Sequence, residues 1–599
     1  MAAEILVTGA TGHLGNVLIR KLIENGKKVR ALIYPGEDAV PLADFDIERV
    51  EGDILEPGSV RQAIHGVRYV FHLASLISIG GVSDDLVRRV NVEGTRNIAL
   101  ACREGGVKRL VYVSSVHALQ RPEDGIAISE NLSFDPKNPA GEYDRSKAEA
   151  SLEVKRIAAT GLDAVIVCPT GIIGPEDYRR SELGRMITLW MKKKPHWMTE
   201  GFFDFVDVRD VADGLIAACR RGVSGETYLL SGTRIRLARL RALVQAEAGL
   251  RSHQITIPAR LALFGSRVVY PFQKLFGTTN GFTPYAIETV MSNSNISCEK
   301  AKRVLGYVSR PIEQSVRDTV AWWRSHQSLD KNPRWYGKVA LVAGASGGIG
   351  AATALKLASK GIEVLLLGRR KDKLDALKEE IESGGGRASC IVADLTQESG
   401  LDEIQNFIAS RYRGIDILVY SAGIGWYGFF SDMNWDTADT MMQVNLRALV
   451  RLTLYALKQM TGRRMGRVVL IGSIAGELEA QGTAVYAATK SFVNTLSRAV
   501  NRELRGSTVS ASVLRPGAVS SGFFDVAKSM VNGRPVPAAN TGITPERVAA
   551  KVWSLVRRPR AFAYVPGGLG ILRFARVLLG FALDLLGPVH LKRQARAGS

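Results

Sequence analysis

The sequence predicts an α/β protein that carries two doubly wound parallel-sheet domains in tandem, and three observations indicate this fold class. The chain has 599 residues, which is too long for one hydrophobic core. A glycine-rich turn follows a short apolar run and precedes a helical pattern twice, at residues 9–15 and 344–350. Tyr143 also stands four residues ahead of Lys147 in the first half, and Tyr486 four residues ahead of Lys490 in the second, so the same pair of motifs is found in both halves.

The charge balance indicates an anionic partner. The formal net charge is +21 at pH 7, whereas the apolar fraction of 46% is ordinary for a globular protein. Phosphorylated cofactors, an acidic carrier, anionic lipid or nucleic acid would fit such an excess of positive charge. The sequence contains no helix-turn-helix, zinc-finger or RNA-binding pattern, so we expect no nucleic-acid partner.

Cysteine and histidine usage indicates no metal site. The eight histidines show no metal-ligand spacing, and the cysteines include no C-x-x-C pair. The five cysteines are typical of reduced, buried thiols: Cys102, Cys168, Cys219, Cys298 and Cys390. The amino terminus runs directly into an apolar strand-like segment and leaves no room for a signal peptide, so we expect a cytoplasmic protein.

The first glycine turn follows the apolar run 4–8 and precedes a helical pattern over residues 16–25. Gly9, Gly12 and Gly15 would let the backbone approach a pyrophosphate at the amino terminus of that helix. The second turn repeats this pattern with Gly344, Gly348 and Gly350. Each half is therefore expected to bind a dinucleotide.

The second half also contains a candidate acid/base site. Tyr486 and Lys490 lie one helical turn apart, so the ammonium group is expected beneath the phenol. A phenol titrates near pH ~10, and a neighbouring cation together with an oxidised nicotinamide ring would favour the phenolate. Ser473 follows the strand-like run 467–472 and could hold a substrate oxygen at the carboxyl edge of a sheet.

Ser473, Tyr486 and Lys490, with the second glycine turn, resemble the site of the short-chain dehydrogenase/reductase family. Residues 337 to about 530 are similar to its classical branch, and residues 4 to about 325 resemble its extended branch. The resemblance implies a Rossmann fold and an NAD(P)-dependent oxidoreductase site in each half. It also implies a homo-oligomer, since classical members often pair through helices beside the active site.

The resemblance assigns a matching catalytic set to the first half. Ser115 ends the strand-like run 109–115 and is implied to orient the substrate oxygen, with Ser114 as its neighbour. Tyr143 is implied to act as the acid/base, and Lys147 as the cation that lowers its pKa.

The cofactor of the first half is expected to be NAD or NADP. By resemblance, Asp53 lies among the contacts to the adenosine. The residue at the end of the second strand is typically acidic for NAD and arginine for NADP. Tyr34 stands there and carries neither charge, so the choice stays open.

The second half is expected to bind NADP(H). Arg369 follows the buried strand-like run 364–368 and can pair with a phosphate, with Arg370 beside it; an exposed positive turn is the alternative. The resemblance implies that Asp394 contacts the adenine and that Gly423 belongs to a cofactor turn. It implies that Asn445 holds a proton-relay water. It also implies that Gly517 and Ser521 belong to the segment that holds the nicotinamide.

The substrate class is narrowed by two features. Dehydratases of the extended branch carry an acidic pair directly after the active hydroxyl, whereas this chain has Val116 and His117, which argues against dehydration. Segment 257–277 is apolar and aromatic with interspersed cations, which suits a lipophilic substrate or a membrane surface; a core helix with a loop is the alternative. The similar families are 3β-hydroxysteroid dehydrogenases and dihydroflavonol reductases.

The sequence divides into four parts. Residues 1–325 form the first domain, the polar stretch 326–336 the linker, and 337–556 the second domain. Segment 557–599 is basic around an apolar run, and charges interrupt that run, so it is a poor transmembrane span. A membrane-surface helix or a helix packed on its own domain or a dimer partner are the two interpretations.

Together these features predict a bifunctional oxidoreductase of lipophilic alcohols and ketones. One version is oxidation of a sterol 3β-hydroxyl with loss of a C-4 carboxylate in the first half, followed by reduction of the 3-ketone in the second. A nucleotide-sugar epimerase or reductase beside an acyl-ketone reductase is one alternative. A half that binds cofactor without catalysis is the other.

Overall fold

The computed structural model describes residues 3–573 except for 36, 38, 78–82, 124, 194–195, 252–253, 267–283, 328, 330–333, 413, 479–480 and 537–541. The chain splits into two compact units, Met1–Asp330 and Lys331–Ser599. This division falls inside the stretch 326–336.

The first unit is built on a seven-stranded sheet in the order β10-β6-β5-β4-β1-β2-β3, and all six strand pairs are parallel. Its strands are β1 (Ile5–Thr8), β2 (Val29–Ile33), β3 (Glu48–Glu51), β4 (Tyr69–His72), β5 (Arg109–Val113), β6 (Ala164–Pro169) and β10 (Thr227–Leu230). The order reverses between β1 and β4, and ligands of such sheets bind at the carboxyl edge beside that point.

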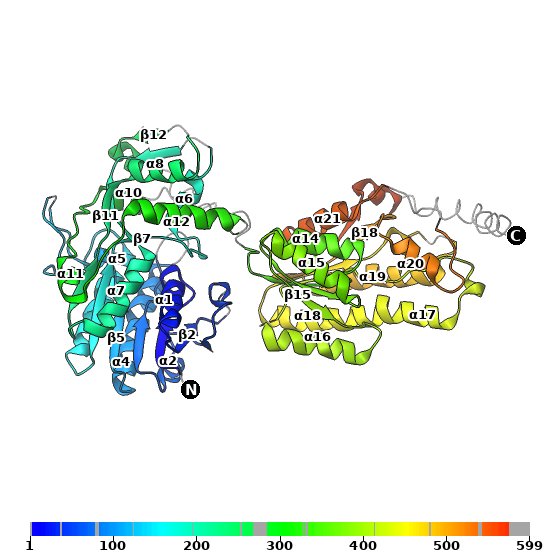
Figure 1. The fold of residues 1–599 in the computed structure, drawn as a ribbon, viewed down its shortest axis with the longest axis horizontal. Helices are drawn as coiled ribbons and strands as arrows, with labels where there is room; N and C mark the ends of the chain where they lie inside the picture. Colours follow the sequence, from blue (N-terminus) through cyan, green and yellow to red (C-terminus); the bar gives the residue numbers. More distant parts are fainter. Residues whose placement is uncertain are drawn as a thin grey trace. The chain divides into compact units, whose positions relative to one another are not determined.

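Helices cover both faces of this sheet (Figure 1). One buried cluster joins the sheet to α2 (Pro57–Ile64), α4 (Thr95–Glu104) and α5 (Glu142–Ala158). The other joins it to α1 (His13–Glu24), α7 (Val208–Arg221) and α11 (Glu299–Leu305). The remaining elements are α3 (Asp84–Arg88), α6 (Glu182–Trp190), α8 (Leu237–Glu247), α10 (Pro284–Met291), α12 (Ile312–Ser325), β7 (Gly171–Ile173), β8 (His196–Thr199), β9 (Phe202–Asp207), β11 (Thr233–Arg236) and β12 (Gln254–Ile257).

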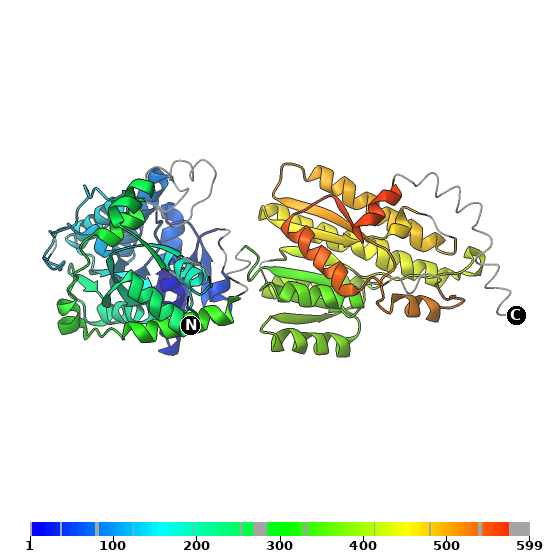
Figure 2. The same ribbon diagram turned by 90° about the horizontal axis from the view of Figure 1, so that it is seen from above.

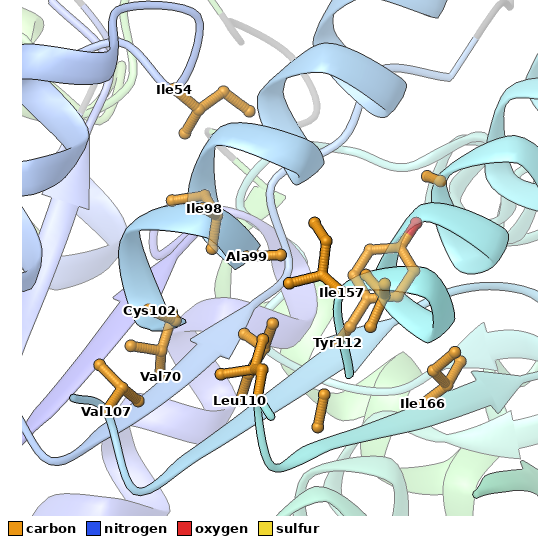
Figure 3. Packing of buried hydrophobic residues seen from close by; sticks show 14 of the residues in the cluster. Ile54, Val70, Ile98, Ala99, Cys102, Val107, Leu110, Tyr112, Ile157 and Ile166 are labelled. Atoms are coloured by element: carbon orange, nitrogen blue, oxygen red, sulfur yellow. The ribbon is translucent and has the colours of Figure 1, made fainter. Parts of the chain in front are cut away.

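Figure 3 shows how the α4 face packs, with Ile98 and Cys102 of the helix lying over Val70 and Leu110 of the strands. All four side chains are fully buried. Removing the Leu110 side chain beyond Cβ would leave a cavity that its neighbours can fill only in part.

Leu110→Ala is therefore expected to lower the free energy of unfolding of the first unit by about 2–5 kcal/mol. Urea unfolding followed by circular dichroism measures this change. Leu261→Ala is the matched control, since that side chain is 64% exposed; equal losses from both variants would contradict the buried packing.

The second unit repeats the same strand order, as β15-β14-β13-β16-β17-β18-β19, again with every pair parallel. The strands are β13 (Val339–Ala343), β14 (Glu363–Gly368), β15 (Ala388–Val392), β16 (Ile417–Tyr420), β17 (Gly466–Ile471), β18 (Val509–Pro516) and β19 (Phe562–Val565). The predicted fold class of two doubly wound sheets in tandem is confirmed.

Helices again lie on both faces, with α14, α15 and α21 on one side and α16, α18 and α19 on the other (Figures 1 and 2). Their bounds, with those of the two remaining α-helices, are α14 (Gly348–Ala358), α15 (Lys371–Ser383), α16 (Glu398–Arg411), α17 (Trp435–Met442), α18 (Leu449–Gly462), α19 (Ala484–Glu503), α20 (Phe523–Ser529) and α21 (Pro545–Arg557).

Two boundaries differ from those expected. Helix α1 begins at His13 rather than at residue 16, because the glycine turn passes directly into the helix. Strand β19, Phe562–Val565, pairs with β18, so the second sheet extends into the segment 557–599 that the sequence separates from the second domain. An edge strand this short carries too little pattern to be recognised beside basic residues.

Two predicted apolar segments are described only in part. In segment 257–277 the described residues end at 266, and Leu261 and Phe264 there are 64% and 71% exposed. In segment 557–599, residues 574–599 lie outside the described residues. Within the part of the chain that the structure describes, no helix is long and apolar enough to cross a membrane.

Candidate active sites

A cavity of about 1690 Å³ opens at the carboxyl edge of the second sheet. It brings together all residues that the sequence predicts for this half apart from Asn445. These are Gly344, Gly348, Gly350, Arg369, Asp394, Gly423, Ser473, Tyr486, Lys490, Gly517 and Ser521.

The glycine turn of this cavity fits a dinucleotide pyrophosphate. Gly344 has φ +84°, and a Cβ there would lie 2.7 Å from the Ala422 nitrogen. A Cβ on Gly350 would lie 2.1 Å from the Gly344 oxygen. The turn therefore packs so closely against its neighbours that these positions have no room for a side chain. The backbone N–H groups at the amino terminus of α14 are the groups that could bind an anion.

We expect Gly350→Ala to weaken binding of NADPH to the second half by about 10²-fold, because the added methyl group must displace the turn or the helix. Isothermal titration calorimetry on the full chain measures this affinity. Gly462→Ala in the same unit is the control, since a Cβ there meets no atom within 4 Å. An unchanged isotherm for Gly350→Ala would show that the turn does not hold the cofactor.

Arg369 lies just beyond β14, and its side chain is 62% exposed. Its Nη1 lies 3.9 Å from an Asp394 carboxylate oxygen. Arg370 Nη2 donates a hydrogen bond of 2.6 Å to the Ser346 carbonyl in the glycine turn. Two guanidinium groups thus face the mouth of the cofactor turn, where a 2′-phosphate could bind both.

The catalytic candidates meet where β17 ends and α19 begins. Ser473 has extended backbone, and its Oγ accepts the Ala475 N–H at 3.1 Å. Lys490 Nζ donates to the Ile471 carbonyl at 3.0 Å, which holds the ammonium beneath the strand end. The Lys490 Nζ lies 5.8 Å from the centre of the Tyr486 ring.

Burial sets the protonation of this pair. It raises the pKa of Tyr486 to about 12, and the hydrogen bond with Ser473 acts in the opposite direction. Burial also lowers the pKa of Lys490 to about 8. The sequence-based expectation that the lysine and an oxidised nicotinamide ring together favour the phenolate stays a prediction, and burial of the phenol acts in the opposite direction. At neutral pH Tyr486 keeps its proton and can donate it.

Asn445 lies in a π-helical turn, Gln443–Ala448, between α17 and α18. Its Oδ1 accepts the Ile424 N–H at 2.9 Å, and its Nδ2 donates to the Ile424 carbonyl at 2.9 Å and to Thr489 Oγ1 at 3.1 Å. The side chain thus joins the loop after β16 to the residue that precedes Lys490. The proton-relay water implied for Asn445 stays a prediction.

Gly423, Gly517 and Ser521 complete this cavity. A Cβ on Gly423 would lie 3.4 Å from Lys490 Nζ, so the turn after β16 approaches the ammonium group closely. A Cβ on Gly517 would lie 3.1 Å from the Ile543 side chain. Ser521 packs on the glycine turn, since a Cβ on Gly348 would lie 2.9 Å from the Ser521 Cβ.

The first unit repeats this arrangement. Lys147 Nζ donates to the Val113 carbonyl at 2.9 Å, and Ser115 Oγ accepts the His117 N–H at 3.2 Å. Ser115 also hydrogen-bonds the Tyr143 phenol, which works against the burial that raises the pKa of Tyr143. Burial lowers the pKa of Lys147 to about 7.

The two serines at the end of β5 have separate contacts. Ser114 Oγ lies 2.7 Å from Ser151 Oγ on α5, inside the core. Ser115 is the serine that reaches the tyrosine. The geometry therefore favours Ser115 as the hydroxyl that meets a substrate.

Asn91 belongs to segment 91–95, where the resemblance implies cofactor and helix contacts, and the structure shows that it matches Asn445. It lies in the π-helical turn Arg89–Gly94, its Oδ1 accepts the Leu76 N–H at 2.8 Å, and its Nδ2 donates to Ser146 Oγ at 3.0 Å. Ser146 precedes Lys147 as Thr489 precedes Lys490. A hydroxyl residue directly before each lysine is the signal that could have revealed the pair.

The first cofactor turn has the same close packing as the second. Gly9 has φ +66°, and Cβ atoms on Gly12 and Gly15 would lie 3.2 Å and 2.1 Å from the Gly9 oxygen. Asp53 Oδ1 accepts the Leu55 N–H at 2.9 Å, just beyond β3. Tyr34 follows β2 and is 58% exposed.

Arg179 is a residue that the sequence did not indicate. Its Nη2 donates to Thr11 Oγ1 at 2.6 Å, and its guanidinium pairs with the Glu37 carboxylate. Thr11 belongs to the glycine turn, so a cation from a segment 168 residues away faces the first phosphate site. Nothing in the local sequence pattern links these positions.

The described residues contain no group of three or more His, Cys, Asp or Glu side chains that could hold a metal ion. All five cysteines are free.

Two doubly wound sheets, each with a close-packed dinucleotide turn beside a Ser-Tyr-Lys set, define an NAD(P)-dependent oxidoreductase. The family model described as "short chain dehydrogenase" matches residues 338–531, and the model "NAD dependent epimerase/dehydratase family" matches residues 5–231. The chain belongs to the short-chain dehydrogenase/reductase family, with an extended-type first half and a classical second half.

Three relatives illustrate the similarity. Sterol demethylase protein B of Methylococcus capsulatus is 34% identical over 321 residues, covering 53% of this chain and 98% of that protein. Sterol-4-alpha-carboxylate 3-dehydrogenase ERG26, decarboxylating, of Saccharomyces cerevisiae is 27% identical over 53% of this chain and 97% of its own length. An uncharacterised short-chain type dehydrogenase/reductase, y4eK, of Sinorhizobium fredii is 35% identical over 37% of this chain and 86% of its own.

Proposed function

We propose that the chain is a bifunctional enzyme of sterol-type substrates. The first half oxidises a 3β-hydroxyl group beside a C-4 carboxylate, and the second half reduces the resulting 3-ketone. One observation carries the proposal: the half with a complete Ser115-Tyr143-Lys147 set is 34% identical to a protein named sterol demethylase protein B over 98% of that protein's length. A second complete set in the same chain supplies the reductase.

The chemistry links the two steps. In oxidation of the alcohol, an oxidised nicotinamide would accept the hydride from C3. Tyr143 would accept the hydroxyl proton in its phenolate form, which the positively charged ring would favour, and Ser115 would orient the alcohol. The product is a β-keto acid, whose carboxylate leaves as CO2 while the electron pair passes into an enolate. Protonation of this enolate at C4 gives the 3-ketone. In the second half Tyr486 donates a proton to the ketone oxygen as hydride arrives at the carbonyl carbon, with Ser473 hydrogen-bonded to the same oxygen.

Nicotinamide absorbance tests this function. The full chain is mixed with a 3β-hydroxysterol 4-carboxylate and NAD+ or NADP+, and separately with a 3-ketosterol and NADPH. We expect reduction of the oxidised cofactor with release of CO2 in the first assay and oxidation of NADPH in the second. Cofactor binding without turnover of either sterol would overturn the sterol assignment.

We also propose NADP(H) as the cofactor of the second half, supported by the guanidinium groups of Arg369 and Arg370 at the cofactor turn. The double variant Arg369→Ala/Arg370→Ala is expected to raise the Kd for NADPH by about 10–10²-fold and to leave that for NADH nearly unchanged. Lys371→Ala is the control, since it removes an exposed cation that does not line the cavity. Equal losses for both nucleotides would contradict a 2′-phosphate contact.

Peripheral membrane contact and a homo-oligomer complete the proposal. Exposed apolar side chains support the first, with Phe264 in one unit 71% exposed and Phe430 beside the cavity of the other 68% exposed. Co-sedimentation with vesicles that contain 30% anionic lipid tests membrane contact, and light scattering tests the oligomeric state. A monomer that stays in the supernatant would contradict both.

A further inference from the structure

A buried ionic cluster joins three segments of the second unit. Arg515 Nη1 lies 2.5 Å from Glu477 Oε1 and donates to the Tyr564 hydroxyl oxygen at 2.9 Å. The Tyr564 hydroxyl in turn donates to Glu477 Oε2 at 2.8 Å. The arginine side chain is 1% exposed and the glutamate 16%, so water screens their attraction little.

These three residues lie next to the parts of the site that must meet during hydride transfer. Glu477 stands four residues beyond Ser473 on the same loop. Arg515 is the penultimate residue of β18, and Gly517 just beyond it lines the cavity in the segment predicted to hold the nicotinamide. Tyr564 is the partner of Arg515 across the β18–β19 pair.

The first unit fills the matching positions with apolar side chains. Leu119 lies four residues beyond the active-site serine and matches Glu477. Cys168 precedes the proline that ends β6 and matches Arg515. Leu229 pairs with Cys168 from β10 and matches Tyr564. All three are buried at 1% exposure or less in one hydrophobic cluster. The same fold therefore forms without an ionic cluster at this place.

An ion pair is a costly way to fill this space. Taking two charges out of water offsets much of their attraction, and well-packed apolar residues of similar volume stabilise a fold as well or better. Arg515 Nε and Nη2 have no hydrogen-bond partner among the residues that the structure describes, where Glu477, Tyr564 and the ring of Phe562 at 5.0 Å contact the guanidinium. What an ion pair adds over an apolar contact is direction, since it fixes one arrangement of the two segments that carry it.

We propose that Arg515 and Glu477 are positioning residues that fix the Ser473 loop relative to the nicotinamide segment. Asn494 holds the other side of this loop, because its Nδ2 donates to the Ser473 carbonyl at 3.2 Å from helix α19. The loop is thereby fixed between α19 and the end of β18. Neither Arg515 nor Glu477 lines the cavity, so both act through Ser473 and the segment that contains Gly517.

The test replaces the pair by apolar residues, as in the first unit, with the double variant Glu477→Leu/Arg515→Met. It is made in the full chain on a Gly15→Ala background, which disables the first cofactor turn. We expect an unchanged or higher Tm, and a weaker affinity for NADPH with an unchanged affinity for adenosine 2′,5′-bisphosphate, which has no nicotinamide. A kinetic assay with a 3-ketosterol and NADPH rests on the proposed function. In this assay the kcat for ketone reduction should fall about 10²-fold.

Two controls separate positioning from stability. Arg467→Met removes another buried arginine, one that donates to the carbonyls of Val556 and Thr508; it should lower Tm without changing the ratio of the two nucleotide affinities. Arg515→Lys, which keeps the charge, should recover part of kcat. An apolar double variant with wild-type NADPH affinity would overturn the proposal, and so would parallel losses for both nucleotides. Absence of sterol turnover in the wild type would reject only the proposed substrate. The affinities for NADPH and adenosine 2′,5′-bisphosphate would still test the positioning role of Arg515 and Glu477.

Discussion

Tyr486→Phe is expected to lower kcat for ketone reduction by about 10²–10⁴-fold and to leave the oxidation catalysed by the first half unchanged. The phenol keeps its proton at neutral pH, since burial raises the pKa of Tyr486 to about 12. Phenylalanine fills the same volume but donates nothing. Steady-state kinetics of the full chain with a 3-ketosterol and NADPH, beside the oxidative assay, measures both activities.

Tyr143→Phe should give the reciprocal result, with oxidation lost and reduction retained. Tyr455→Phe is the matched control for both, because that residue lies on α18, does not line the cavity, and donates a long hydrogen bond of 3.4 Å to the Gln405 carbonyl. If either single substitution abolished both reactions, the two halves would share one catalytic tyrosine and the tandem interpretation would fail.

The fold could be predicted because its signals are local and repeated. Each glycine turn lies between an apolar run and a helix, and each tyrosine-lysine pair is one helical turn long, so a window of about twenty residues contains each signal. Strand β19 was missed for the opposite reason. It has four residues and is recognised as a strand only through its pairing with β18.

Some residues of the two sites could likewise be predicted from local spacing, and others could not. Ser473, Tyr486 and Lys490 follow from spacing, and the cavity brings them together with the glycine turn. The ion pair between Arg179 and Glu37 could not be predicted, because 142 residues separate the two (179 − 37 = 142) and their meeting depends on how a loop crosses α1. The same holds for Arg515 and Glu477, which meet only once β18 lies beside the serine loop.

The state of the buried lysines also depended on the fold. The sequence predicts a lysine cation beside each tyrosine, but it gives no measure of how far the ammonium is removed from water. Lys147 is 2% exposed and donates its hydrogen bond to the Val113 carbonyl, and within the described parts of the chain no carboxylate pairs with it. Burial accordingly lowers its pKa to about 7. This residue therefore links the stability of the first unit to pH.

The free energy of unfolding of the first unit is expected to rise with pH between about 7 and 10, and Lys147→Met should remove this part of the rise. The folded-state pKa of Lys147 is about 7 and its ordinary value is 10.5, so in this window the unfolded chain binds a proton that the folded protein does not. Stability then increases with pH. Below pH 7 both states are protonated, and the full cost of burying the cation is present.

Between pH 7 and pH 9 the difference in unfolding free energy between wild type and Lys147→Met should therefore shift by about 2 kcal/mol in favour of the wild type. Urea unfolding at each pH measures it, on the transition that Leu110→Ala displaces. Burial raises the pKa of the Cys102 and Cys168 thiols, which lowers stability at high pH, but both proteins carry these thiols and the difference cancels them. Lys155→Met, an exposed lysine on the same helix, is the control. A difference independent of pH would mean that Lys147 keeps its proton in the folded protein, and Tyr143 would then have a full cation beside it during catalysis.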